Sequence, residues 1–136
     1  MQSFSSKGLK VGLGIRGIFG AIVLGAICLN QPLFGSSSSL LWAKVLLFLA
    51  AFVYVAFSLI WDRKFLPLTY FQILAAVLLL VLSIMTGNVL FVALGLFFHA
   101  IWDLWHLATQ KRYVPYWYAG ACVYVDLAAV ALILMN

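Results

Sequence analysis

The sequence is poor in charged residues and in cysteine. Charged side chains make up 8% of its 136 residues, whereas soluble domains contain about 25%. Because 67% of the residues are also hydrophobic, the composition excludes a water-soluble globular protein and predicts a multi-pass membrane protein. The two cysteines, Cys28 and Cys122, are expected near opposite sides of the membrane, which is too far apart for a disulfide.

Several motifs of well-known active sites are also missing. The sequence contains no H-E-x-x-H segment, no glycine-rich phosphate loop and no G-x-S-x-G turn. His99 and His106 lie on one segment and cannot hold a single haem from its opposite faces. The net charge of +5 sits beside apolar runs instead of forming a long solvated patch, so nucleic-acid binding is not expected.

Long apolar runs divide the chain into five expected transmembrane helices. Each run is close to the roughly 20 residues that cross a bilayer. The apolar stretch from 68 to 109 is too long for one crossing, and Thr86-Gly87-Asn88 is its only turn-like segment. No stretch resembles a separate soluble domain, so residues 1–136 are expected to form one all-α bundle. The expected helices cover residues 11–29, 41–61, 68–85, 89–109 and 116–135.

The basic residues predict the orientation of these five helices. When the helices alternate in direction, six basic residues fall on one side and Lys44 lies near the other. The positive-inside rule assigns the first side to the cytoplasm. We therefore expect a cytoplasmic N-terminus, an external C-terminus and a location in the cytoplasmic (inner) membrane. The six residues are Lys7, Lys10, Arg63, Lys64, Lys111 and Arg112.

Ionisable side chains gather at one level of the last two expected helices. His99, Asp103 and His106 share one helical face, and Cys122 and Asp126 share a face of the next helix. His99 and Asp126 each lie about ten residues from the cytoplasmic boundary, and Asp103 and Cys122 each lie about six residues from it, roughly 9 Å at helical rise. These two faces are predicted to meet in the cytoplasmic half of the membrane.

This set of side chains supports three kinds of chemistry. Imidazole, thiolate and carboxylate groups bind divalent transition metals such as zinc, so His99, Asp103, Cys122 and Asp126 are candidate metal ligands. Their His-x-x-x-Asp and Cys-x-x-x-Asp pattern resembles, over these four residues, the paired sites of zinc-exporting cation-diffusion facilitators. The groups could also relay protons, because histidine titrates near neutral pH. Alternatively, His99 and Asp126 could be the catalytic base and acid of an enzyme that acts on a lipid-like or isoprenoid substrate.

The leading interpretation is a small integral membrane protein that binds or translocates a cation at a His/Asp site open to the cytoplasm. A membrane enzyme and an accessory subunit of a larger membrane complex are the alternatives, and a purely structural His99–Asp126 hydrogen bond is a fourth reading. His106, near the interface, is an accessory candidate. Arg16 is another, because it can snorkel to the headgroups or neutralise Asp103. Besides the lipid bilayer, the expected partner is a second copy of the chain, contacted through the Gly17 face of the first helix, or a larger complex.

Overall fold

The structure, a computed structural model, describes residues 6–29, 38–61, 63–109 and 114–135, and every regular element in these ranges is helical. Four helices in this part of the chain are long and apolar enough to cross a membrane. The predicted all-α class is therefore confirmed, and the four apolar helices fit the predicted multi-pass membrane protein. The four helices are α3 (Ser38–Trp61), α4 (Leu66–Thr86), α5 (Leu90–Thr109) and α6 (Tyr116–Met135).

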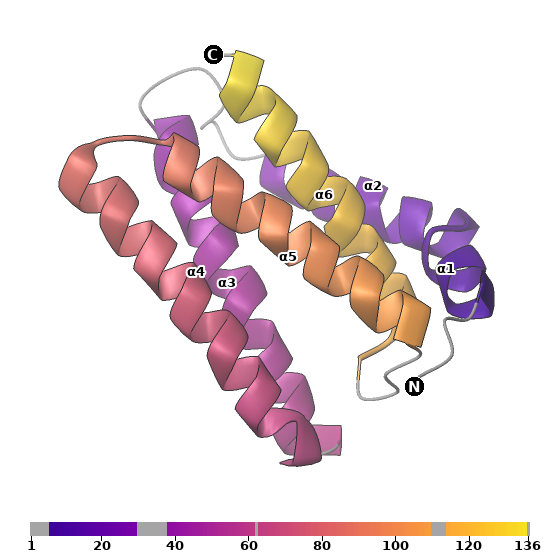
Figure 1. Ribbon diagram of the computed structural model, residues 1–136. Coiled ribbons are helices and arrows are strands. Elements are labelled where there is room, and N and C mark those ends of the chain that lie inside the picture. Colours follow the sequence, from indigo (N-terminus) through magenta and orange to yellow (C-terminus); the bar gives the residue numbers. More distant parts are fainter. Residues whose placement is uncertain (1–5, 30–37, 62, 110–113, 136) are drawn as a thin grey trace.

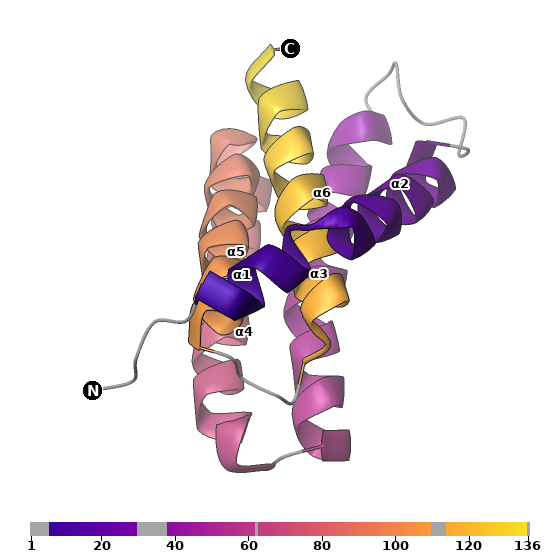
Figure 2. The same ribbon diagram turned by 90° about the vertical axis from the view of Figure 1, so that its right-hand side faces the viewer.

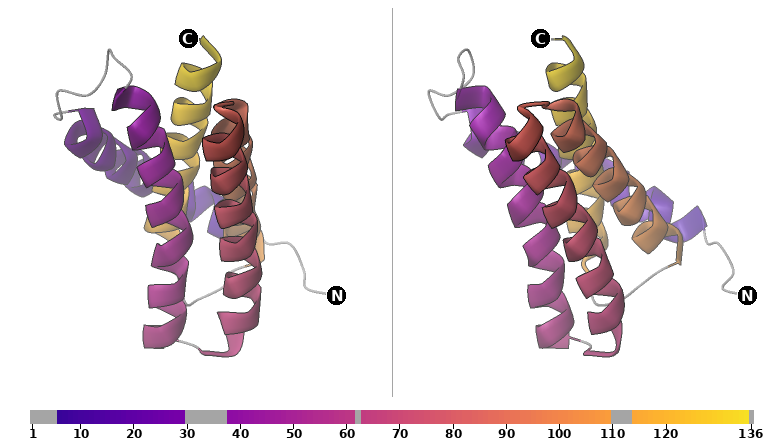
Figure 3. Two further views of the ribbon diagram at one scale, coloured as in Figure 1. Left: turned by 90° about the vertical axis from the view of Figure 1, so that its left-hand side faces the viewer. Right: turned by 60° about the vertical axis from the view of Figure 1, so that its left-hand side comes forward.

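Short connections make consecutive long helices antiparallel neighbours. The 3-10 helix η1 (Arg63–Phe65) links α3 to α4, and Figure 1 shows this hairpin beside the hairpin of α5 and α6. The other views in Figure 3 show the same alternation of direction. The expected boundaries of α4, α5 and α6 lie within two residues of the observed ones, whereas α3 begins at Ser38, three residues before the expected helix 41–61.

The expected first helix, residues 11–29, is interrupted in the structure. α1 (Ser6–Gly12) ends before α2 (Ile15–Leu29) begins. Near the break the hydroxyl of Tyr124 in α6 donates a hydrogen bond of 2.6 Å to the carbonyl of Leu13, so a tertiary contact satisfies this backbone group. Figure 2 shows α1 and α2 crossing the bundle obliquely beside α5 and α6. Hydropathy predicts one continuous run because it carries no information about this contact.

Three glycines explain why the chain bends at this point. A Cβ atom on Gly17 would lie 1.8 Å from the carbonyl oxygen of Gly12, and a Cβ atom on Gly120 would lie 1.7 Å from it. No residue other than glycine permits such an approach, so α1, α2 and α6 meet backbone to backbone. The predicted glycine face of the first helix is thus used within the chain at Gly17, and the expected homodimer would need another surface.

The turn predicted at Thr86-Gly87-Asn88 is confirmed. Gly87 has a φ of 66°, the left-handed conformation in which helices commonly end. The Asn88 side chain then accepts a hydrogen bond of 2.9 Å from the backbone N–H of Leu90, which is the capping contact that starts a new helix. One glycine and one asparagine therefore end α4 and begin α5.

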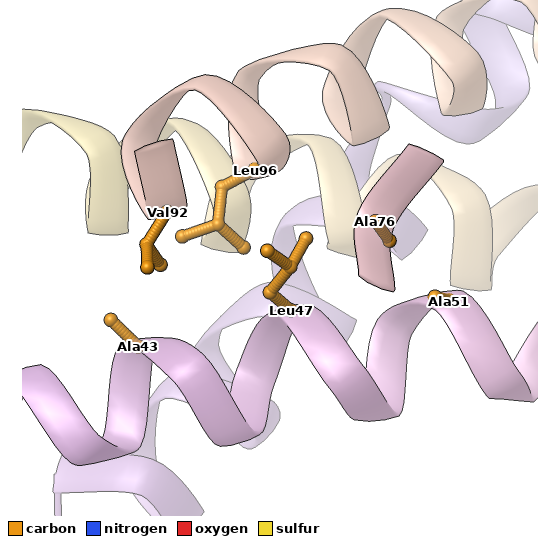
Figure 4. Packing of buried hydrophobic residues seen from close by; sticks show 6 residues of the cluster. All are labelled: Ala43, Leu47, Ala51, Ala76, Val92 and Leu96. Atoms are coloured by element: carbon orange, nitrogen blue, oxygen red, sulfur yellow. The ribbon is translucent and has the colours of Figure 1, made fainter. Parts of the chain in front are cut away.

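A core of small and branched side chains joins α3, α4 and α5. Leu47 of α3 is 1% exposed and lies against Gly95 of α5, where a Cβ atom would come within 2.7 Å of the leucine side chain. Glycine at this position lets α3 and α5 approach closely, as is usual between membrane helices. Figure 4 shows the buried cluster around Leu47. Its members are Ala43, Leu47, Ala51, Ala76, Val92 and Leu96.

Adding a methyl group at Gly120 tests the three-glycine contact. Gly120→Ala is expected to push α1 away from α6 and to lower the free energy of unfolding by about 1–3 kcal/mol, the usual cost of overpacking. The measurement is thermal unfolding of the purified protein in detergent. Ala128→Val on the exposed face of the same helix is the matched control and should change little. Equal unfolding midpoints for Gly120→Ala and the unaltered chain would show that these backbones do not touch.

Candidate functional site

Two carboxylates and one imidazole meet inside the bundle. Nδ1 of His99 lies 2.7 Å from Oδ2 of Asp126 and 3.3 Å from Oδ2 of Asp103. All three side chains are buried, with exposed fractions of 3% for His99, 0% for Asp103 and 1% for Asp126. The first distance is a hydrogen bond between α5 and α6. The structure therefore places the three groups together at a depth where an unpaired charge is costly.

Helical periodicity explains why α5 and α6 present these groups to each other. Val92, Gly95, His99 and Asp103 follow one another at spacings of three or four residues and are all buried, so they form one stripe along α5. On α6 the small residue Ala119 and then Asp126 are buried on the facing side. Because the connection between α5 and α6 is short, residues equally far from it lie side by side, and His99 meets Asp126 as the sequence spacing predicts.

Tyr54 of α3 completes the group and was not predicted. Its side chain is 0% exposed, and its hydroxyl donates a hydrogen bond to Oδ1 of Asp103. This contact joins residues 49 positions apart, which no helical spacing indicates. The sequence did contain one signal for this residue. Tyrosine is common at the ends of membrane helices, so a tyrosine well inside the expected helix 41–61 indicates a buried hydroxyl that needs a hydrogen-bond partner. The group is therefore built by three helices instead of two.

Two polar atoms of the group have no hydrogen-bond partner among the described residues. They are Nε2 of His99 and Oδ2 of Asp103, and both are buried. The ring of Tyr54 meets the His99 ring edge to face at a centroid distance of 5.6 Å, so an aromatic wall shields the imidazole. Buried polar atoms without partners are rare in folded proteins and mark places where a ligand could bind.

Comparison of the chain with protein-family models, curated proteins and solved structures finds no match. What the site can do therefore rests on its own chemistry. One nitrogen and two carboxylate oxygens, one from each of His99, Asp103 and Asp126, lie within 4.8 Å of one another. Imidazole and carboxylate are common ligands of divalent transition metals, which bind at about 2.0–2.2 Å. The three side chains could thus hold one metal ion after small shifts, which include a lengthening of the 2.7 Å distance between His99 and Asp126.

Cys122 and His106, which the sequence also suggested as ligands, lie outside this group. Cys122 is buried on α6, but its sulfur is not among the clustered ligand atoms. Nδ1 of His106 lies 2.9 Å from the carbonyl oxygen of Trp102, one turn earlier on the same helix. The His106 ring also packs against Tyr54 at a centroid distance of 4.9 Å. His106 is therefore buried in an aromatic cluster, three residues before the end of α5.

Arg16 lies away from the three clustered residues. It is exposed, and no ion pair joins it to a described residue. The ion pair between Arg16 and Asp103 is not formed in this structure, where Asp103 contacts Tyr54 and His99. Arg16 instead lines a groove between α2 and α6.

Removing the hydroxyl group of Tyr54 tests its part in the cluster. Tyr54→Phe leaves a buried carboxylate oxygen of Asp103 without its donor. We expect it to destabilise the protein by roughly 1–2 kcal/mol, more than the average of about 0.6 kcal/mol for a polar contact between membrane helices. The measurement is the free energy of unfolding in mixed detergent micelles. The same change at the exposed Tyr70 is the control, and equal effects at the two positions would argue against the Tyr54–Asp103 bond.

Proposed function

We propose that this chain is a membrane protein that binds a divalent transition-metal ion at His99, Asp103 and Asp126 and moves it across the bilayer. The observation that carries this proposal is the clustering of one imidazole and two carboxylates, nearly fully buried, within 4.8 Å of one another. Intramembrane ionisable residues mark ion pathways and binding sites by default. Three protein ligands also leave room for a fourth ligand from water, as in exchangeable metal sites.

Charge balance favours a doubly charged ion. Ionised Asp103 and Asp126 together carry two negative charges, while Arg16 and every other described basic residue stay outside the group. A dication bound to two carboxylates and a neutral imidazole gives a group without net charge. Such a neutral group avoids most of the cost of placing an ion in a medium of low dielectric constant.

The unsatisfied atoms of the site support metal binding over a purely structural role. A His99–Asp126 hydrogen bond alone would join α5 to α6, but Nε2 of His99 then has no hydrogen-bond partner in the described structure. Oδ2 of Asp103 has no hydrogen bond either, and it lies 3.3 Å from Nδ1 of His99. Asp103 accepts the hydrogen bond that joins α3 to α5, but an uncharged acceptor could do the same without the like-charge repulsion that its carboxylate adds to Asp126. A cation gives both carboxylates a reason to be there.

The arrangement of the termini supports five crossings with the basic end in the cytoplasm. Gly12 at the end of α1 lies against Leu107, near the end of α5, and against the start of α6 at Tyr116. The chain must then cross to the opposite end of the bundle to begin α3 at Ser38 (Figure 1). In the proposed topology α1 and α2 provide the first crossing, and the positive-inside rule places the N-terminus on the cytoplasmic side of the cytoplasmic (inner) membrane.

One ligand of the proposed site, Asp103, lies nearer to this basic end than to the other, whereas His99 and Asp126 lie near the middle of α5 and α6. Asp103 precedes the last residue of α5, Thr109, by six residues, about 9 Å at helical rise. A cation would thus enter from the cytoplasmic side. A second copy of the chain is the proposed partner, because a translocation pathway is difficult to enclose with so few helices. None of the three clustered residues lines the groove between α2 and α6, so this groove does not support the enzyme alternative.

Metal binding is the first test of this function. The purified protein should bind one Zn²⁺ or other divalent transition-metal ion per chain, measured by elemental analysis after equilibrium dialysis. His99→Ala removes a ligand and should weaken binding by more than about 100-fold, beyond the 10–100-fold that loss of a supporting residue costs. His106→Ala removes a histidine from the same helix outside the cluster and should retain the ion. If the unaltered protein binds no metal, or if both variants bind it equally, the site is not a metal centre.

Transport is tested separately in liposomes. Asp126→Asn keeps the size of the side chain and removes the charge that balances the cation. We expect this variant to reduce metal flux into dye-loaded vesicles to the level of empty liposomes, whereas Lys44→Gln, near the opposite end of the bundle, should retain flux. Undiminished flux in Asp126→Asn would contradict translocation through this site, even where metal binding is observed.

A further inference from the structure

A groove on the outer surface between α2 and α6 has the dimensions of a ligand site. Its volume is about 620 Å³, within the roughly 300–1,000 Å³ range of small-molecule sites. The lining atoms are almost all apolar, and Arg16 is the one lining residue that carries a charge. The residues that line it are Ile15, Arg16, Phe19, Gly20, Val23 and Trp117. None of them belongs to the buried cluster of His99, Asp103 and Asp126.

Arg16 gives the groove an unbalanced positive charge. It is exposed on α2 and forms no ion pair with any described residue. Its neighbours Ile15 and Phe19 are 84% and 67% exposed, so the cation stands within an apolar surface of the kind that faces lipid. A guanidinium group in such a surface is well suited to bind a phosphate, because it can donate two parallel hydrogen bonds to the phosphate oxygens.

The packing of α2 on α6 fixes the depth of this cation. Gly17, next to Arg16, packs against Gly120, and Gly20 packs against the ring of Trp117. Trp117 is the second residue of α6, at the basic end of the bundle, and tryptophan favours the headgroup level of a membrane. Arg16 can therefore reach lipid phosphates while the rest of the groove, toward Val23, lies along acyl chains.

We propose that this groove binds one anionic phospholipid, with its phosphate paired to Arg16 and an acyl chain lying over Phe19 and Val23. Charge complementarity selects this occupant. The groove offers one cation and no acidic side chain among its lining residues, so it balances a net negative headgroup. A zwitterionic headgroup carries its own positive charge and gains less. Basic sites between helices on the cytoplasmic face bind acidic lipids in the same way.

Lipid competition on the full-length protein tests this proposal. The chain is purified in detergent and titrated with phosphatidylglycerol or with phosphatidylcholine of identical acyl chains, and bound lipid is counted by native mass spectrometry. We expect phosphatidylglycerol to bind about fivefold more tightly, the factor that one cation contributes at an anionic lipid surface. Arg16→Gln should abolish this preference. Lys10→Gln, an exposed cation of α1 that does not line the groove, is the matched control and should retain it.

A second variant tests the apolar part of the groove. Val23→Trp places a large ring where the acyl chain would lie, and it should reduce binding of both lipids without removing Arg16. Soluble glycerol phosphate should fail to displace phosphatidylglycerol, because it lacks the acyl chain. Equal affinity for the two lipids, a preference that survives Arg16→Gln, unchanged binding in Val23→Trp or displacement by glycerol phosphate would each overturn the proposal. These readings do not depend on metal binding at His99.

Discussion

The need to bury two carboxylates and an imidazole within membrane-spanning helices governs the rest of this structure. Each ionisable group at this depth must be satisfied by the protein or by a bound cation. Three helices therefore converge on one point: α5 supplies His99 and Asp103, α6 supplies Asp126 and α3 supplies the hydroxyl of Tyr54. Small residues around this point, such as Gly95 and Ala119, let the backbones come close enough for short side chains to meet.

Sequence reasoning succeeded where the information was local. The stripe of buried residues on α5 follows from helical periodicity, and the meeting of His99 with Asp126 follows from matching depths across a short connection. Tyr54 could not be found in this way, because its place beside Asp103 depends on how α3 packs on α5. The interruption of the first helix has the same origin, since the contact between Gly12 and Gly120 exists only in the folded chain. Local patterns thus predicted the long helices and the pairing of α5 with α6. The place of Tyr54 and the break in the first helix depend on tertiary packing.

The acidic residues Asp103 and Asp126 and the basic residue Arg16 lie in different parts of the structure. Asp103 and Asp126 face the interior, whereas Arg16, the cation that sequence reasoning also offered as their partner, faces outward on α2. The two carboxylates and Arg16 are therefore each left without a full counter-charge from the described residues. In the two proposals, a bound cation balances the interior group and an anionic lipid balances the outward cation. One principle, that charge in an apolar medium needs a partner, leads to both proposed ligands.

Burial of the cluster also constrains how an ion could reach it. His99, Asp103 and Asp126 are almost fully enclosed, so helices must separate before an ion can enter. All three proposed ligands lie on α5 and α6, which pack on each other more extensively than either packs on α3. If an ion enters the proposed site, α3 is therefore the wall that can move while the three ligands stay together, and this movement would break the bond from Tyr54 to Asp103.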